Sequence, residues 1–137
     1  MECLFCKFVQ QKEKLVAEKK LYLVGENKEV IAILDAFPAS DGHTLLITKK
    51  HFANLSEVDE ESWKHLRPLM KEVIIKLEKT FQPAGFNVIS NLNEMAAQSI
   101  FHLHIHIIPK YEKEQGFIWT AKPNLKFSLE QVTEKLK

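Results

Sequence analysis

Residues 102–109 read HLHIHIIP, and this strict alternation of histidine with apolar residues is the strongest constraint on the fold. Side chains of a β-strand point to opposite faces in turn, whereas those of a helix repeat about every 3.6 residues. The alternation therefore predicts a strand over FHLHIHIIP, ended by Pro109, with one face in the core. Leu103, Ile105 and Ile107 form that apolar face, and the three histidines share the other.

A face made of His102, His104 and His106 has three explanations: a polar filler, a metal site or a nucleophilic site. A filler face usually mixes residue types, which weighs against the first. At about 3.3 Å per residue, His102 and His106 lie about 13 Å apart along a strand. Zn–N bonds are about 2.0–2.1 Å, so one ion does not hold all three histidines. An imidazole can also attack phosphorus, with neighbouring imidazoles as hydrogen-bonding partners of the phosphate. The three histidines therefore divide into at least two roles.

The rest of the chain predicts several strands around one long helix. Strands are expected at 21–25, 29–35, 43–48 and 86–93, and helices at 4–14, 56–80 and 128–135. The long helix carries an apolar stripe at three- and four-residue steps: Trp63, Leu66, Met70, Val73, Ile74, Leu77 and Phe81. Ser56 or Asp59 can cap its start, and Pro68 is expected to kink it. Strands without β-α-β alternation predict an α+β fold with a largely antiparallel sheet.

Composition excludes several classes of function. The 137 residues suit one domain, and 19 basic against 18 acidic residues give a net charge of +1. That balance gives no reason to expect nucleic acid or an anionic membrane as a partner. We find no apolar run of membrane-spanning length and no signal peptide, so a cytoplasmic location is expected. In a reducing compartment, the spacing of Cys3 and Cys6 favours a metal or redox role over a disulfide.

Three stretches of this sequence together resemble the histidine triad (HIT) superfamily of nucleotide hydrolases and transferases, most closely its Hint-like branch. HLHIHII fits the signature His-φ-His-φ-His-φ-φ, in which φ is apolar. AAQSIFHLHIHIIP is similar to the family's extended block, with Ala97 where glycine is usual, and DAFPASDGHTLLITKKH is similar to an upstream block, with Thr48 where proline is usual. The resemblance covers about residues 3–119 of one domain over 1–137 and leaves 120–137 as a C-terminal tail. It implies a HIT fold: a mainly antiparallel five-stranded sheet, one long helix and a shorter C-terminal helix.

The resemblance also implies a role for each matching position. His104 would be the nucleophile that takes up the nucleotidyl group, and His106 and His43 would hold the phosphate. The remaining positions would be donors to the phosphate or leaving group (Gln98 and Ser99), ribose and pocket contacts (Asp35 and Asn91), and a base pocket (Leu4, Phe5, Phe8, Ile33 and Ala36). The apolar members would also suit any core, and Asp35 would also suit the cap of a loop. His65 lies off the apolar stripe and is expected on the surface.

A subset of the family, mostly bacterial, carries a structural zinc ion on two cysteines and two histidines. The matching residues here are Cys3, Cys6, His51 and His102. A set of two thiolates and two imidazoles satisfies tetrahedral zinc. Such a zinc would tie the N-terminus to the triad strand, and no catalytic metal is required. The alternative is two thiols without a metal.

The resemblance implies a hydrolase that acts at the α-phosphate of purine nucleotides, such as a nucleoside phosphoramidate, through a nucleotidyl-histidine intermediate. Three alternatives stay open. A dinucleoside polyphosphate hydrolase would use the same triad. A metal-binding protein would instead hold a hydrolytic zinc at the triad. A slow-turnover nucleotide-binding or interaction module would fit Ala97 and the atypical stretch 10–30. The resemblance also implies a homodimer, with Trp119 as the residue to watch at the partner's site.

Overall fold

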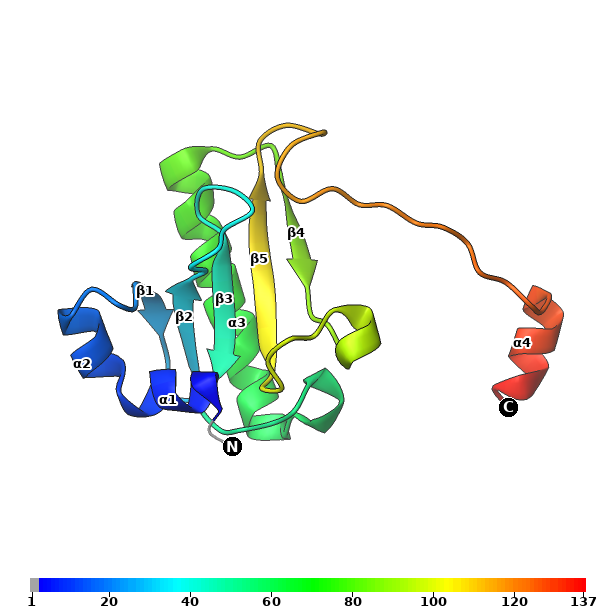
Figure 1. Ribbon diagram of the computed structural model, residues 1–137, viewed down its shortest axis with the longest axis horizontal. Coiled ribbons are helices and arrows are strands. Elements are labelled where there is room, and N and C mark those ends of the chain that lie inside the picture. Colours follow the sequence, from blue (N-terminus) through cyan, green and yellow to red (C-terminus); the bar gives the residue numbers. More distant parts are fainter. Residues whose placement is uncertain (1–2) are drawn as a thin grey trace.

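The computed structural model describes residues 3–137, and it forms an antiparallel sheet of five strands with one long helix on one face (Figure 1). The elements are, in chain order, α1 (Leu4–Gln10), α2 (Lys12–Ala17), β1 (Leu23–Glu26), β2 (Val30–Leu34), β3 (Thr44–Thr48), the 3₁₀ turn η1 (Leu55–Glu57), α3 (Glu60–Phe81), β4 (Gly85–Ile89), the 3₁₀ turn η2 (Glu94–Ala96), β5 (His104–Lys110) and α4 (Leu129–Lys135). The strand order is β1-β2-β3-β5-β4. This confirms the predicted α+β fold and places β5 inside the sheet.

Both faces of the sheet are covered by apolar residues. Val30, Ala32 and Leu46 face α3, and in the same cluster lie Leu103, Ile105 and Ile107. The alternate residues Ile31, Ile33, Leu45 and Ile47 face the other way, where Phe5 and Leu15 of the N-terminal helices cover them. Because side chains alternate along a strand, the histidines next to Ile105 lie on the side of α1. The predicted division of this stretch into two faces is therefore confirmed.

The limits of β5 differ from the prediction at both ends. The strand begins at His104, because the Leu103 amide donates to the Phe52 carbonyl at 2.7 Å rather than to a neighbouring strand. His102 thus precedes the strand. At the other end β5 continues through Pro109 to Lys110, paired only with β4 there. The Pro109 carbonyl accepts from the Ser40 hydroxyl at 2.6 Å, so the N–H that proline lacks costs no ladder bond.

The long helix begins later than predicted, and its buried stripe shares Leu66, Val73 and Leu77 with the predicted stripe. Asp59 caps it, since its side chain accepts from the Ser62 amide at 2.8 Å, and Ser56 lies in η1. The helix continues through Pro68. Leu69 joins the buried stripe, whereas Trp63 and Phe81 are 51% and 47% exposed. The prediction that these two residues belong to the buried stripe was therefore wrong, since they lie at its margins.

The two ends of the chain hold shorter helices. The predicted helix 4–14 is two helices that meet at Gln11, and the second extends to Ala17. The C-terminal helix α4 has a capping box formed by Ser128 and Gln131, and it lies away from the sheet at the end of an extended segment (Figure 1). Within residues 3–137 no helix combines the length and the apolar character needed to cross a membrane.

A substitution at Gly42 tests the close packing between α3 and the loop before β3. Its φ is +92°, and a Cβ there would lie 2.7 Å from Leu77 Cδ2 and 3.3 Å from Pro109 Cγ. We expect Gly42→Ala to lower the free energy of unfolding by about 1–3 kcal/mol, through strain and overlap together. Urea unfolding measures this. Gly85→Ala is the matched control, because a Cβ there meets nothing within 4 Å; equal effects of the two substitutions would contradict the explanation.

Candidate functional site

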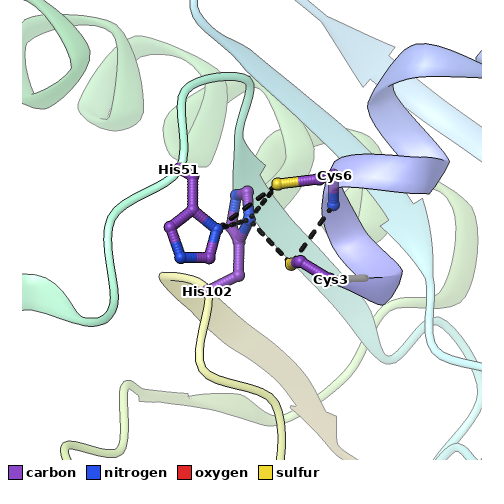
Figure 2. A group of neighbouring side chains, drawn as sticks. All are labelled: Cys3, Cys6, His51 and His102. Atoms are coloured by element: carbon purple, nitrogen blue, oxygen red, sulfur yellow. Dashed lines mark hydrogen bonds between the residues drawn. The ribbon is translucent and has the colours of Figure 1, made fainter. Parts of the chain in front are cut away.

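Four metal-ligating side chains from three separate parts of the chain meet at one end of β5. Cys3 caps α1, Cys6 lies in its first turn, His51 follows β3 and His102 precedes β5. Figure 2 shows the two sulfur atoms and the two imidazole rings turned toward one another. One ligand atom from each lies within 4.8 Å of all the others. We call these four residues the Cys₂His₂ group.

The spacing within the Cys₂His₂ group fits a tetrahedral ion. His102 Nδ1 lies 3.4 Å from Cys3 Sγ, 3.5 Å from Cys6 Sγ and 3.2 Å from His51 Nδ1, and Cys6 Sγ lies 3.3 Å from His51 Nδ1. Zn–S bonds of about 2.3 Å and Zn–N bonds of about 2.0–2.1 Å place tetrahedral ligand atoms about 3.3–3.8 Å apart. The two sets of distances agree to within a few tenths of an ångström. The predicted ligands therefore form a group that could hold a metal ion.

The hydrogen bonds of His102 leave Nδ1, the ring nitrogen that faces the cysteines, free to bind a metal. Nε2 lies 2.7 Å from the Thr48 carbonyl oxygen, which only accepts, so Nε2 carries the proton. Burial lowers the pKa of His102, which keeps the ring neutral. Its lone pair is then on Nδ1, the atom that faces both cysteines. A backbone carbonyl that orients a ligating histidine in this way is common in metal sites.

A second cluster lies further along the same face of the sheet. His104 and His106 are on β5, His43 immediately precedes β3, and Asp35 follows β2. The strand order β2-β3-β5 makes them neighbours. His43 Nε2 lies 3.0 Å from His106 Nδ1 and 3.4 Å from Asp35 Oδ2. The structure thus brings together the four residues that the sequence had placed in one site.

Hydrogen bonds also determine the proton positions in this second cluster. The Ala39 amide donates to His43 Nδ1 at 3.0 Å, so the His43 proton is on Nε2, which donates to His106 Nδ1. Burial lowers the pKa of His43, and burial with the neighbouring His104 and His43 lowers the pKa of His106 to about 4. Both rings are neutral near pH 7. His106 therefore carries its proton on Nε2 and offers it as a hydrogen-bond donor.

His104 has the opposite arrangement. Its Nδ1 lies 2.8 Å from the backbone carbonyl of His102 and donates to it. In the neutral ring the lone pair is then on Nε2. The ring centroid lies 5.2 Å from that of His106 and 5.0 Å from that of Phe5. A nucleophilic nitrogen and a neighbouring N–H donor are the two groups that attack on a phosphorus centre needs.

Asp35, His43 and His106 also satisfy the distance criterion for a metal site, with ligand atoms within 4.8 Å of one another. Their hydrogen bonds weigh against that use. Because the Ala39 amide occupies the lone pair of His43 Nδ1, a neutral His43 has a proton on Nε2, the nitrogen that faces the cluster. A proton there excludes a metal bond. The alternative of a hydrolytic zinc at the triad therefore receives no support from the proton positions.

The other predicted site residues occupy varied environments. Gln98 is 3% exposed, and its side-chain nitrogen donates to the carbonyls of Ala53 and Ile100, so both donor hydrogens are used in joining the loop before β5 to the segment between β3 and η1. The remaining positions are buried (Phe5 and Ile33), half-buried (Phe8 and Asn91) or exposed (Leu4, Ala36 and Ser99). Sequence reasoning missed the Ala39 amide and the Thr48 carbonyl. They are backbone groups, which leave no signal in residue type.

Comparisons with known proteins agree with this geometry. A family model described as the HIT domain matches residues 16–113. An uncharacterised HIT-like protein of Mycoplasma pneumoniae is 42% identical over 98% of this chain and 89% of its own. A Schizosaccharomyces pombe protein named adenosine 5′-monophosphoramidase is 34% identical and covers 100% of both chains. The crystal structure of a HIT family member from Bacillus subtilis matches with a TM-score of 0.83 and 31% identity, covering 99% of this chain and 95% of that one.

The low pKa of His106 makes the stability of the fold dependent on pH. The unfolded ring titrates at its ordinary value of 6.5, whereas the folded ring titrates at about 4. Between these values the unfolded chain binds more protons, so the stabilisation is complete above pH 6.5 and is lost as pH falls toward 4. We expect His106→Asn to reduce the fall in unfolding free energy between about pH 7.5 and about pH 5 by about 1–2 kcal/mol. Urea unfolding at both pH values measures it, and an unchanged fall would contradict the account.

Proposed function

The chain belongs to the HIT family, and on that premise we propose that it is a hydrolase acting at the α-phosphate of purine nucleotides through a nucleotidyl-histidine intermediate. One observation carries the proposal: His104 has its lone pair on Nε2, and the neighbouring His106 has a proton on Nε2. The two rings differ in this way because different groups hold their Nδ1 atoms. The residue roles that follow are part of the proposal.

The reaction has two steps. His104 Nε2 attacks the α-phosphorus and forms a P–N bond, while the bond to the leaving group breaks; that group departs with the electron pair and takes up a proton from solvent water. His106 Nε2–H donates to a phosphoryl oxygen, on which negative charge grows. The His104 ring becomes cationic, and the His102 carbonyl at its Nδ1–H stabilises that charge. Water then attacks phosphorus and releases a proton to solvent, the electron pair of the P–N bond returns to His104 Nε2, and the nucleoside monophosphate leaves.

The surroundings of the two histidines support a nucleotide as the substrate. Asp35 Oδ1 accepts from the Phe37 amide at 2.9 Å, while Oδ2 faces His43 at the edge of the cluster, where a ribose hydroxyl would add a donor. Phe5 and Ile33 form an apolar wall on the same face of the sheet. Relatives from Schizosaccharomyces pombe and Saccharomyces cerevisiae, 34% and 32% identical, are named adenosine 5′-monophosphoramidase. An adenosine phosphoramidate is therefore the first substrate to test.

Substitution of His104 tests the nucleophile. We expect the wild type to release AMP from an adenosine phosphoramidate and to carry one adenylyl group in the steady state, detected by mass spectrometry. His104→Ala removes the attacking nitrogen and should lower kcat by about 10³-fold or more. His65→Ala is the control and should turn over like the wild type, because α3 packs on the face of the sheet opposite His104. Equal turnover by His104→Ala would refute the role of His104.

The choice of leaving group needs a second substrate in the same assay. A dinucleoside polyphosphate offers the same α-phosphate with a nucleotide as the leaving group. Faster turnover of that substrate would favour the polyphosphate hydrolase. Tight AMP binding without turnover of either substrate would favour the binding module.

We further propose that the Cys₂His₂ group binds one structural zinc ion. When bound, the ion would cross-link α1 to the start of β5 and would supply no group to the reaction. We expect about one zinc per chain in the purified protein, lost in Cys6→Ser. At free zinc about 1,000-fold above its Kd, the loss would lower stability by about 4 kcal/mol. Metal analysis and thermal unfolding with and without a chelator measure both; a zinc content near zero that added zinc does not restore would sink the proposal.

A homodimer is the proposed assembly. β4 is an edge strand, and beside it lies a groove of about 390 Å³ lined by Leu55, Trp63, Leu66, Arg67, Met70, Val88, Ile89, Ser90 and Ile105. Trp63 and Val88 in this groove are 51% and 46% exposed, and Trp119 is 78% exposed. A second copy would cover this apolar surface and pair the edge.

Light scattering tests the assembly. We expect the mass of two chains for the wild type and of one chain for Val88→Lys, because the new charge would lie in the apolar interface. Ile75→Lys, also at an exposed apolar position but outside the groove, is the matched control and should stay dimeric. A wild type that scatters as a single chain at micromolar concentration would contradict the homodimer.

A further inference from the structure

Besides the candidate metal ligands Cys3 and Cys6, the region of helix α1 brings an aromatic ring close to His104. Phe5 lies between Cys3 and Cys6 in sequence and is 3% exposed. Its ring meets the His104 ring edge-on, with centroids 5.0 Å apart and planes at 81°. It also meets the His102 ring at 6.0 Å and 80°. The helix that would be held by a metal thus presents one side of the wall around the nucleophile.

His102 forms a second connection between the two clusters. Its imidazole belongs to the Cys₂His₂ group and is fixed at Nε2 by the Thr48 carbonyl. Its backbone carbonyl accepts from His104 Nδ1 at 2.8 Å. A displacement of the His102 side chain would therefore move the oxygen that sets both the tautomer and the orientation of the nucleophile.

The stability of helix α1 depends on its contacts with the rest of the protein. It has seven residues and a cysteine sulfur as its cap, with Cys3 Sγ accepting from the Cys6 amide at 3.4 Å. A helix shorter than about 12 residues is marginal in water without tertiary contacts. The contacts that hold α1 against the sheet are the apolar cluster around Phe5 and the Cys₂His₂ group. Removing a metal from the group would leave the apolar cluster to place Phe5.

We propose that the Cys₂His₂ group is a positioning device for the nucleophile: its metal holds α1 so that Phe5 confines the His104 ring, and it holds His102 so that the carbonyl stays on His104 Nδ1. Phe5 and His102 are then positioning residues, and nucleotidyl transfer depends on a metal that takes no part in the chemistry. The expected effect on the rate rests on the proposed function. The expected effect of removing the metal rests on the proposed zinc. The structural core of the proposal, the confinement of the His104 ring, is measurable without turnover.

The two roles of Phe5 predict different kinetic signatures. A residue that only lines a base pocket affects nucleotide affinity, so its loss raises KM and the Kd for AMP. A residue that orients the nucleophile affects the rate of P–N bond formation, because a displacement of about 1 Å at a reacting group costs about 10²-fold. The ratio of these effects separates positioning from binding.

The experiment compares four proteins: metal-loaded wild type, chelator-stripped wild type, metal-loaded Phe5→Leu and metal-loaded Val9→Ala. Leucine keeps an apolar side chain but removes the ring edge beside His104. Val9, also on α1 and packed on the same cluster, is the matched control for a loss of helix packing. The measurements are zinc content, the Kd for AMP, the single-turnover rate of His104 adenylylation, and the proton NMR signal of His104 Nδ1–H, assigned by its absence in His104→Ala.

We expect Phe5→Leu to keep its zinc and to bind AMP within about threefold of the wild type, while adenylylation slows about 10–100-fold. The Nδ1–H signal should broaden or disappear, since a freely turning ring exchanges that proton with water. Stripped wild type, at a temperature where it stays folded, should show the same two changes, and added zinc should reverse them. Val9→Ala should keep both the rate and the signal of the wild type.

Each other outcome overturns a defined part of the proposal. An unchanged rate and an unchanged Nδ1–H signal in Phe5→Leu would reject the positioning role of Phe5. If stripping unfolds the chain, Phe5→Leu decides alone. A metal-free protein with a sharp Nδ1–H signal would show that the position of the His104 ring does not depend on the metal. If the wild type turns over no substrate, the proposed function fails by itself, and the NMR signal still accepts or rejects confinement of the ring.

Discussion

The alternation of side chains along β5 is the constraint on which the site depends. Leu103, Ile105 and Ile107 are buried against α3, so the residues between them must face the opposite side of the sheet. β5 is also an inner strand, held by β3 on one side and β4 on the other. A slip by one residue would bury imidazoles and expose isoleucines, which the core does not allow. The hydrophobic effect thus keeps His104 and His106 on one rigid surface.

Hydrogen bonds with backbone groups then give the imidazoles different proton positions. The Thr48 carbonyl directs His102 Nδ1 toward two cysteines, the His102 carbonyl leaves His104 Nε2 with a lone pair, and the Ala39 amide, through His43, leaves His106 with a proton on Nε2. Burial keeps His43, His102 and His106 neutral by lowering their pKa values. Three chemically identical side chains within five positions therefore differ in their proton positions: His102 has its lone pair on Nδ1, His104 has its lone pair on Nε2, and His106 has its proton on Nε2.

Much of the fold was predictable because it depends on local patterns. The α+β class, the long helix and the C-terminal helix follow from periodicity and turn residues, and the structure confirms them. The boundaries were less predictable. Trp63 fits the helical stripe by spacing, yet it lies at the margin of the sheet and is half exposed. Pro109 is an ordinary strand terminator, yet it continues β5 because Ser40 rather than a strand faces it. Gln98 matched a family position, but its side-chain nitrogen donates to the backbone carbonyls of Ala53 and Ile100.

By itself the sequence determined the two faces of the triad stretch and the fold class, because these depend on neighbours in the chain, and its resemblance to the HIT family supplied the members of both clusters. Tertiary structure decided which nitrogen of His102 and which nitrogen of His106 carries the proton. His102 and Thr48 are 54 positions apart, and His43 and His106 are 63 apart, so their hydrogen bonds exist only once the strands are paired. The sequence assigns the three histidines of HLHIHIIP different roles only through a resemblance, and their proton positions differ once the sheet has formed. What separates them is a set of backbone amides and carbonyls, which every residue possesses and no sequence pattern reveals.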